Sequence, residues 1–186
     1  EQVIKKGIEN ARKACEGTDC IVALDLGPIG RLVEPTGDLK FEEAYDIYKE
    51  QVIAGREADV IVFETMTDLL ELKAAVPRYS TLQIQSNAEI IVLNGGVICT
   101  MTFEQNMRTF TGCQVSSMAL TMEGLGVDAL GVNCSLGPDE LYPVVEELGR
   151  YTRLPLVVKP NAGLPDPVTN EYNVTPHHLY TWLLSQ

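Results

Sequence analysis

Short apolar runs alternate with helical patterns along the whole chain, and this alternation restricts its fold more than any other feature. Apolar runs of the buried-strand type lie at 20–24, 60–63, 97–100, 129–133 and 156–159. Amphipathic patterns lie around them, at 3–14, 41–54, 69–76, 115–125, from Pro138 onward and from Pro176 to about Leu184. Strands that alternate with helices pair in parallel through right-handed crossovers. The sequence therefore predicts an α/β protein with a parallel sheet of about five strands.

Two local signals mark where helices begin. Asp68 and Glu71 have the spacing of a capping box for the helix at 69–76, after a predicted turn at 65–67. Thr175 followed by Pro176 combines a favoured N-cap with a favoured first helical residue.

Composition excludes several classes of partner. The chain has 186 residues and a formal net charge of −12, and its 14 Lys and Arg residues form no run, which argues against binding nucleic acid. No apolar stretch reaches the roughly 18–20 residues of a membrane-spanning helix, and the charged start at 1–6 is unlike a signal peptide. We therefore expect a cytoplasmic protein with no membrane partner.

The cysteines are predicted to be reduced thiols. There are five, with no C-x-x-C pair and no local zinc-finger spacing: Cys15, Cys20, Cys99, Cys113 and Cys134. Any metal site must therefore combine residues that are distant in sequence.

Polar side chains stand at the end of each predicted strand. They are Asp25; Glu64 with Thr65; Thr100 with Thr102; Asn133 with Cys134; and Lys159 with Asn161. The carboxyl ends of parallel strands meet at one edge, where α/β proteins bind ligands. The sequence thus predicts a site that contains carboxylates, amides, hydroxyls and a thiol.

Each of these residues also has a simpler interpretation. Glu64 could bind a substrate ammonium group or cap the following helix, and Asp25 could belong to the site or to the turn at Gly27–Pro28. Cys134 could be a small buried apolar residue. Lys159 could form a Schiff base or simply be solvated.

Five segments closely resemble the homocysteine-binding domain of cobalamin-dependent methionine synthases, within the wider homocysteine S-methyltransferase family. They are DLGPIGRLVEPTGDL at 25–39, FETMTDLLELKAAV at 63–76, MTFEQNMRTFTG at 101–112, DALGVNCSLGPDE at 128–140 and PNAGLP at 160–165. The segments occur in the family's order and cover most of the chain.

This resemblance implies a (β/α)₈ barrel of the TIM type, with a zinc ion held by three cysteine thiolates at the strand ends. Cys134 would be the first of these ligands, and Asn161 would lie near the metal. Glu64 would bind the amino group of homocysteine, and we place Asn133 and Asp25 with it as predicted substrate-binding residues. The methyl group would come from methylcobalamin, recharged by methyltetrahydrofolate, on cobalamin- and folate-binding domains that are absent from this sequence.

The chain departs from the family pattern at both ends. The family's Gly-Gly-Cys-Cys motif, which supplies two zinc ligands, and its first-strand Asp-Gly motif do not occur here. We therefore expect residues 1–186 to form a partial barrel domain with strands 3–7 of the family barrel, lacking strands 1, 2 and 8. One thiolate is too few for a catalytic zinc site, so we expect this piece alone to be inactive and largely zinc-free.

A third departure is the segment 77–96, which is longer than the family pattern. Residues 80–85 and 89–93 have strand patterns, and an Asn-Gly-Gly turn follows at 94–96. An added hairpin, an extended loop and an edge for pairing between chains all remain open.

Two other functions also remain open. One is an aldolase-type lyase that uses Lys159 as the Schiff-base amine. The other is a non-catalytic assembly fragment that self-associates through its open sheet edges.

Overall fold

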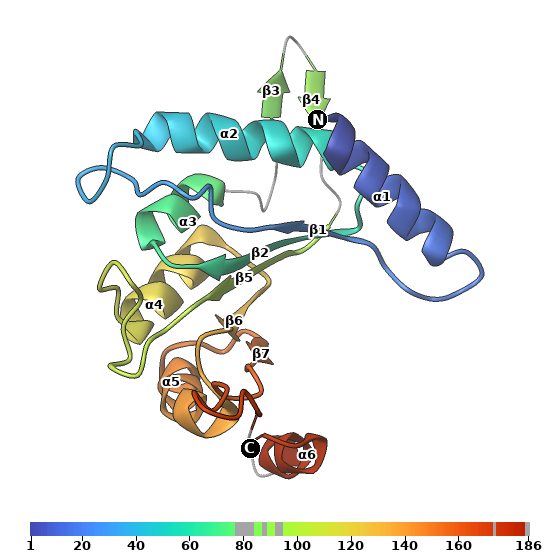
Figure 1. The fold of residues 1–186 in the computed structure, drawn as a ribbon. Helices are drawn as coiled ribbons and strands as arrows, with labels where there is room; N and C mark the ends of the chain where they lie inside the picture. Colours follow the sequence, from blue (N-terminus) through green and yellow to red (C-terminus); the bar gives the residue numbers. More distant parts are fainter. Residues whose placement is uncertain (77–83, 87–88, 92–94, 173, 185–186) are drawn as a thin grey trace.

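The computed structural model describes residues 1–76, 84–86, 89–91, 95–172 and 174–184 (Figure 1). Its main sheet has five strands, all parallel, in the order β1-β2-β5-β6-β7, which is also their order along the chain. The strands are β1 (Ala23–Leu26), β2 (Val60–Met66), β5 (Val97–Met101), β6 (Ala129–Asn133) and β7 (Leu156–Lys159). The prediction of a parallel α/β sheet is confirmed.

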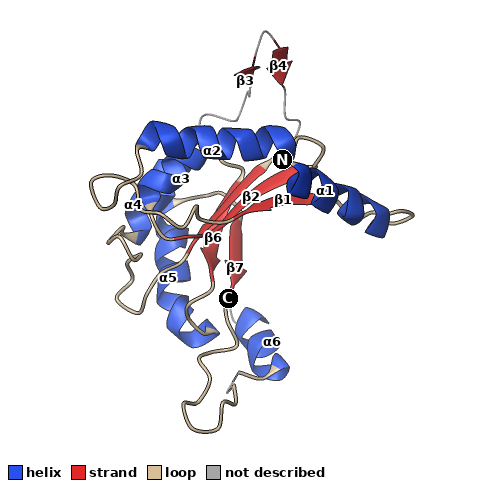
Figure 2. Cartoon of the chain, turned by 45° about the horizontal axis from the view of Figure 1, so that its top comes forward, coloured by secondary structure: helices blue, strands red, loops and turns tan. Residues whose placement is uncertain are grey.

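Four of the described helices cover one face of this curved sheet (Figures 1 and 2). The described helices are α1 (Gln2–Ala14), α2 (Phe41–Ala54), α3 (Leu69–Ala75), α4 (Val115–Leu125), α5 (Pro138–Tyr151) and α6 (Pro176–Leu184). Figures 1 and 2 show α2, α3, α4 and α5 on the convex face, while the concave face is open between α1 and α6. None of the described helices is long and apolar enough to cross a membrane.

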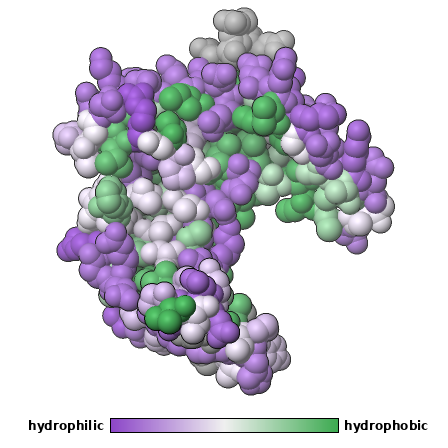
Figure 3. Space-filling view, viewed as in Figure 1, coloured by the Kyte–Doolittle hydropathy of each residue, from purple (hydrophilic) through white to green (hydrophobic). Residues whose placement is uncertain are grey.

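The core lies between the convex face of the sheet and these helices. Tyr48 of α2 and Phe63 of β2 are fully buried, and their rings pack edge to face with centroids 5.8 Å apart. The side chains that alternate with the core residues point to the other face: Asp25 of β1 is exposed, and Val62 and Glu64 of β2 are half-buried. Figure 3 shows the molecule hollowed on this side, with apolar residues on the wall near α1.

Part of the segment 77–96 forms an antiparallel hairpin. β3 (Ile84–Ser86) pairs with β4 (Glu89–Ile91), with Gln85 opposite Ile90. The predicted strand residues 80–83 and 92–93 and the first turn residue Asn94 lie outside the described residues. The hairpin interpretation is confirmed for β3 and β4, which pair in antiparallel.

Strand bounds differ from the predicted ones near the start of the chain. β1 begins at Ala23, three residues later than predicted, because the preceding residues form a turn in which Thr18 Oγ accepts a hydrogen bond from the Cys20 N–H. Asp25 therefore lies inside β1, paired in register with Val62, rather than after the strand. β2 runs through the predicted turn as far as Met66, with a register shift after Phe63.

Two helix predictions also need correction. Val3, the first residue of the predicted amphipathic pattern at 3–14, is 85% exposed, because the contact side of α1 is formed by Ile4, Ile8 and Ala11. The predicted capping box of α3 is only partly formed. Asp68 accepts a hydrogen bond from the Leu70 N–H, as an N-cap residue does. Glu71 instead accepts hydrogen bonds from the Ile29 N–H and the Tyr48 hydroxyl.

Candidate functional site

Glu64 and Lys159 form an ion pair across the concave face. Glu64 lies on β2 and Lys159 on β7, with β5 and β6 between them in the sheet. Only strong curvature lets the two side chains meet. Glu64 is half-buried, and the Lys159 side chain is 47% exposed.

Asp25 belongs to the same charged group. Partial burial raises the pKa of Asp25, the nearby Glu64 carboxylate raises it further, and the Lys159 ammonium opposes the shift. Two carboxylates and one ammonium therefore face each other in the hollow. The structure brings Asp25, Glu64 and Lys159 together, although Asp25 and Glu64 lie within their strands rather than after them.

Asn133, the last residue of β6, is the centre of a buried hydrogen-bond network. Its Oδ1 accepts from the Thr65 N–H at 2.9 Å and from the Thr100 hydroxyl at 2.7 Å. Its Nδ2 donates to Thr65 Oγ1 at 2.8 Å and to Cys134 Sγ at 3.2 Å. An amide has two donor hydrogens and two acceptor lone pairs, so all four positions are used within the chain.

Cys134 has a backbone conformation that is unusual for its residue type. Cys134 has φ of +59° and Ser135 has φ of +63°, while Thr65, which contacts the thiol at 3.8 Å, has φ of +59°. Left-handed φ values are uncommon outside glycine, and most so for a β-branched residue such as Thr. Such strain persists when surrounding contacts impose it, and it gathers at functional sites. Here the amide of Asn133 joins the two strained positions.

Asn161 lies on the loop beside Cys134. The Cys134 N–H donates to the Lys159 carbonyl at 3.1 Å, and the Asn161 N–H donates to the Leu136 carbonyl at 3.0 Å, so the two loops continue the pairing of β6 with β7. A Cβ at Gly137 would lie 3.1 Å from Gly163 Cα, which shows how closely the loops approach. Both predicted metal-site residues thus lie on adjoining loops.

The donors in the described part of the chain do not form a zinc site by themselves. No group of three or more His, Cys, Asp or Glu side chains there is arranged to hold a metal ion. Cys134 has a hydrogen-bond donor on its sulfur, as metal-bound thiolates commonly do, but it supplies only one ligand. The residues present therefore do not fit a complete metal centre.

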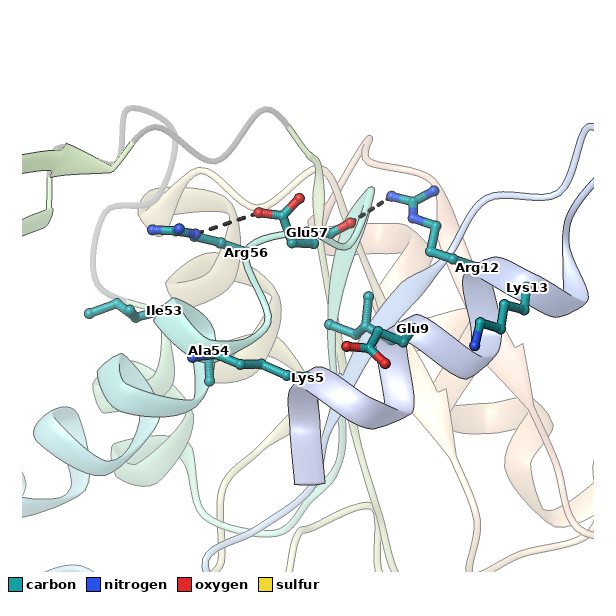
Figure 4. A pocket seen from close by; sticks show the side chains of 9 residues that line it. Lys5, Glu9, Arg12, Lys13, Ile53, Ala54, Arg56 and Glu57 are labelled. Carbon is teal, nitrogen blue, oxygen red and sulfur yellow. Dashed lines mark hydrogen bonds and ion pairs between the residues drawn. The ribbon is translucent and has the colours of Figure 1, made fainter. Parts of the chain in front are cut away.

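A cleft of about 700 Å³ lies between α1 and α2, away from these residues (Figure 4). Its wall includes Arg12, Arg56 and Glu57, and Arg12 also holds Asp59 with two hydrogen bonds. These residues precede β2, so the cleft is at the amino-terminal end of the strands. That end of a barrel contributes to stability, whereas ligand sites lie at the carboxyl end.

The family of the chain follows from comparison with known proteins. The family model for homocysteine S-methyltransferase matches residues 1–185. The chain belongs to the homocysteine S-methyltransferase family. This confirms the resemblance found in the sequence.

Relatives within this family include two methionine synthases. The chain is 33% identical to the methionine synthase of Mycobacterium tuberculosis over 142 residues, and 32% identical to that of Mycobacterium leprae over 142 residues. Each alignment covers 75% of this chain and 11% of the relative. The chain therefore spans about a tenth of the length of these methionine synthases.

A solved structure has the same fold. The homocysteine methyltransferase MmuM of Escherichia coli, in its apo form, superposes with a TM-score of 0.69 at 24% identity. The match covers 86% of this chain and 59% of that protein, so the five-stranded sheet corresponds to part of a TIM-type barrel. The predicted fold class is confirmed.

The sequence did not predict how the site residues contact one another. Thr65 and Thr100 were expected at the site as strand-end hydroxyls, but their hydrogen bonds to Asn133 join positions 68 and 33 residues apart. The pairing of Lys159 with Glu64 was also missed. No spacing in the sequence predicts these contacts, since they depend on the register of the strands and the curvature of the sheet.

Proposed function

We propose that this chain is the part of a homocysteine S-methyltransferase that binds homocysteine and presents its sulfur for methylation. One observation carries the proposal: Thr65, the residue after Glu64, contacts the thiol of Cys134. A carboxylate suited to an ammonium group is thus one residue along β2 from the residue that contacts a thiol suited to a metal. These are the two ends of homocysteine that such an enzyme must hold.

Glu64 is proposed to bind the substrate ammonium, with Asp25 adding negative charge nearby. The contact of the substrate ammonium with these carboxylates would hold the amino end of the substrate and leave its sulfur free to extend toward Cys134. In the reaction, the homocysteine thiolate forms a bond to the methyl carbon while the donor keeps the electron pair of the bond that breaks. The donor is proposed to be methylcobalamin, renewed from methyltetrahydrofolate on other domains of a longer enzyme.

Cys134 is proposed as one thiolate ligand of a zinc site, with Asn161 close to the metal. The remaining two cysteine ligands are expected in a Gly-Gly-Cys-Cys motif, which these 186 residues do not contain. Because its amide is saturated, Asn133 is proposed to orient Cys134 and Thr65 rather than to contact the substrate directly.

The Schiff-base lyase is the weaker alternative. A lysine that forms a Schiff base is usually desolvated or placed beside another cation. Lys159 is half exposed and paired with a carboxylate. Borohydride trapping with a carbonyl substrate would label Lys159 if the lyase interpretation were correct. Self-association through the outer strands β1 and β7 is a separate prediction, which light scattering at high concentration tests.

Homocysteine binding is the direct test of the proposal. Titration of the ¹⁵N-labelled chain with L-homocysteine, followed by NMR, should shift the amide signals of β2 and β6. Glu64→Gln removes the charge and should weaken binding about tenfold, since a charge-assisted hydrogen bond is lost. Glu104→Gln, at an exposed loop position after β5, is the matched control. Equal affinity of both variants would exclude the proposed role of Glu64.

Zinc content tests the role of Cys134. After dialysis against zinc, this chain should retain well below one zinc per chain. A longer chain that includes the Gly-Gly-Cys-Cys motif should bind about one zinc, and Cys134→Ser should abolish that binding. Full zinc binding by the Cys134→Ser form of the longer chain would overturn the assignment.

A further inference from the structure

The ion pair between Glu64 and Lys159 has a chemical complement in one class of ligand. An α-amino acid carries an ammonium and a carboxylate on the same carbon, so it needs an anion and a cation side by side. Glu64 and Lys159 supply such a pair on the concave face, and Asp25 supplies a second anion beside them.

The three charges suit a zwitterion better than a simple amine. Among the described residues, Lys159 contacts Oε2 of Glu64, and no hydrogen bond there engages Oε1 or the Asp25 carboxylate, so both can receive an incoming ammonium group. A bare amine would bring one positive charge and leave Lys159 without a new partner. A zwitterion brings a carboxylate as well, so charges of opposite sign alternate around the site and Glu64 need not be separated from Lys159.

The position of Lys159 supports a binding role. Its backbone carbonyl accepts from the Cys134 N–H, so the residue is anchored beside the thiol loop. Its side chain, half exposed on the concave face, is long enough to follow a ligand within the hollow. Among the described residues, Glu64 is the one side chain that forms an ion pair or hydrogen bond with the Lys159 ammonium group.

We propose that Lys159 binds the α-carboxylate of the amino-acid substrate, while Glu64 and Asp25 bind its ammonium. The inference rests on the proposed function, because it assigns a specificity-determining residue to the same site. It makes the site selective for α-amino acids over thiols that lack either charged group.

Ligands without sulfur test this proposal independently of any metal. NMR titrations of the ¹⁵N-labelled chain would compare L-2-aminobutyrate, which is homocysteine without its sulfur atom, with propylamine and with butyrate. The wild-type chain should bind L-2-aminobutyrate at least about tenfold more tightly than either single-charge analogue, since one charge-assisted contact is missing from each.

Substitution of Lys159 should remove one part of this selectivity. Lys159→Met should lower the ratio of the affinity for L-2-aminobutyrate to the affinity for propylamine about tenfold, so that the preference for the zwitterion disappears. Lys159→Arg keeps the charge and should preserve most of the preference. Lys73→Met, at an exposed position on α3, is the matched control and should behave as wild type.

Different results would overturn the inference and the proposed function. If Lys159→Met binds propylamine and L-2-aminobutyrate more tightly, Lys159 is only an internal competitor for Glu64 and the inference is wrong. If homocysteine binds through Glu64 but Lys159→Met leaves the ratio of the affinities for L-2-aminobutyrate and propylamine unchanged, the inference fails and the proposed function stands. If Lys159→Met weakens the binding of L-2-aminobutyrate as expected, but homocysteine binds no more tightly than L-2-aminobutyrate, the inference stands and the proposed function fails.

Discussion

The side-chain amide of Asn133 donates a hydrogen bond to the sulfur of Cys134, the next residue in the chain, over 3.2 Å. The same nitrogen donates to Thr65 on β2, and the amide oxygen accepts from Thr65 and from Thr100 on β5. One buried amide therefore connects three strand ends and sets the direction of the thiol.

Asn133→Ala should destabilise the fold by about 2–4 kcal/mol, because it leaves the partly buried Thr65 N–H and the buried Thr100 hydroxyl without partners. Urea denaturation measures the change. Asn10→Ala, at an exposed position on α1, should stay within about 0.5 kcal/mol of wild type. A similar small effect at Asn133 would show that the network contributes little to stability.

Gly131→Ala should also destabilise the sheet. A Cβ at Gly131 would overlap the Val157 carbonyl oxygen of β7, and that contact is with backbone, which cannot rotate away. We expect a loss of about 1–3 kcal/mol or more, measured by thermal or urea denaturation.

Gly149→Ala is the control for that experiment. Gly149 lies in α5 with no atom within 4 Å of an added Cβ, so alanine should stabilise the helix by about 0.5–1 kcal/mol. If both glycine variants were stabilised, β6 and β7 could not be as close as the structure has them.

Glu71→Gln should gain stability relative to wild type as the pH rises. Burial raises the pKa of Glu71 above its ordinary value, and the hydrogen bonds from Ile29 and Tyr48 only partly oppose the shift. The native state therefore holds the Glu71 proton more tightly than the unfolded chain does. That stabilisation is complete below the ordinary pKa and is lost as the pH rises through the raised pKa. The glutamine side chain of the variant does not titrate, and urea denaturation from about pH 4 to about pH 7 should show the difference growing.

Asp59→Asn should show the opposite dependence. The hydrogen bond from Arg12 lowers the pKa of Asp59, so the stabilisation is present at neutral pH and is lost as the pH falls through the lowered value. The variant should therefore be less stable than wild type near neutrality and should approach it in acid. If both variants followed the same trend, the pH effect would not arise from these two carboxylates.

Cysteine reactivity should differ sharply between Cys99 and Cys20. Cys99 of β5 is fully buried, and burial raises its pKa far above the usual value, whereas Cys20 is exposed. Since thiolate is the reactive form, Cys99 should react with iodoacetamide more slowly by a factor on the order of a hundred or more. Peptide mapping by mass spectrometry measures each site.

Cys113 gives an intermediate case in the same experiment. Burial raises its pKa to about 11, and its side chain is only partly covered. It should therefore react more slowly than Cys20 and faster than Cys99. Rapid labelling of Cys99 in the native chain would contradict the buried position of β5.

Much of the fold could be predicted because it is encoded locally. The bounds of α2, α4, β6 and β7 agree with the sequence patterns, since periodicity and end signals act within a few residues. β1 was misplaced by two to three residues because its start depends on a turn and on pairing with residues near Asp59. Glu71 was misassigned because its partners, Ile29 and Tyr48, are distant in sequence.

The sequence by itself determined that this is a parallel α/β chain with a carboxylate, a thiol and amides at the strand ends, because alternating periodicity sets both element type and strand direction. Only the tertiary structure decided which of these groups meet. Glu64 and Lys159 are 95 residues apart and on strands separated by two others, yet sheet curvature brings their charges together. Similarly, strand register decided that Asn133 holds Thr65 and Cys134. Such contacts depend on the shape of the whole sheet, which no local pattern contains.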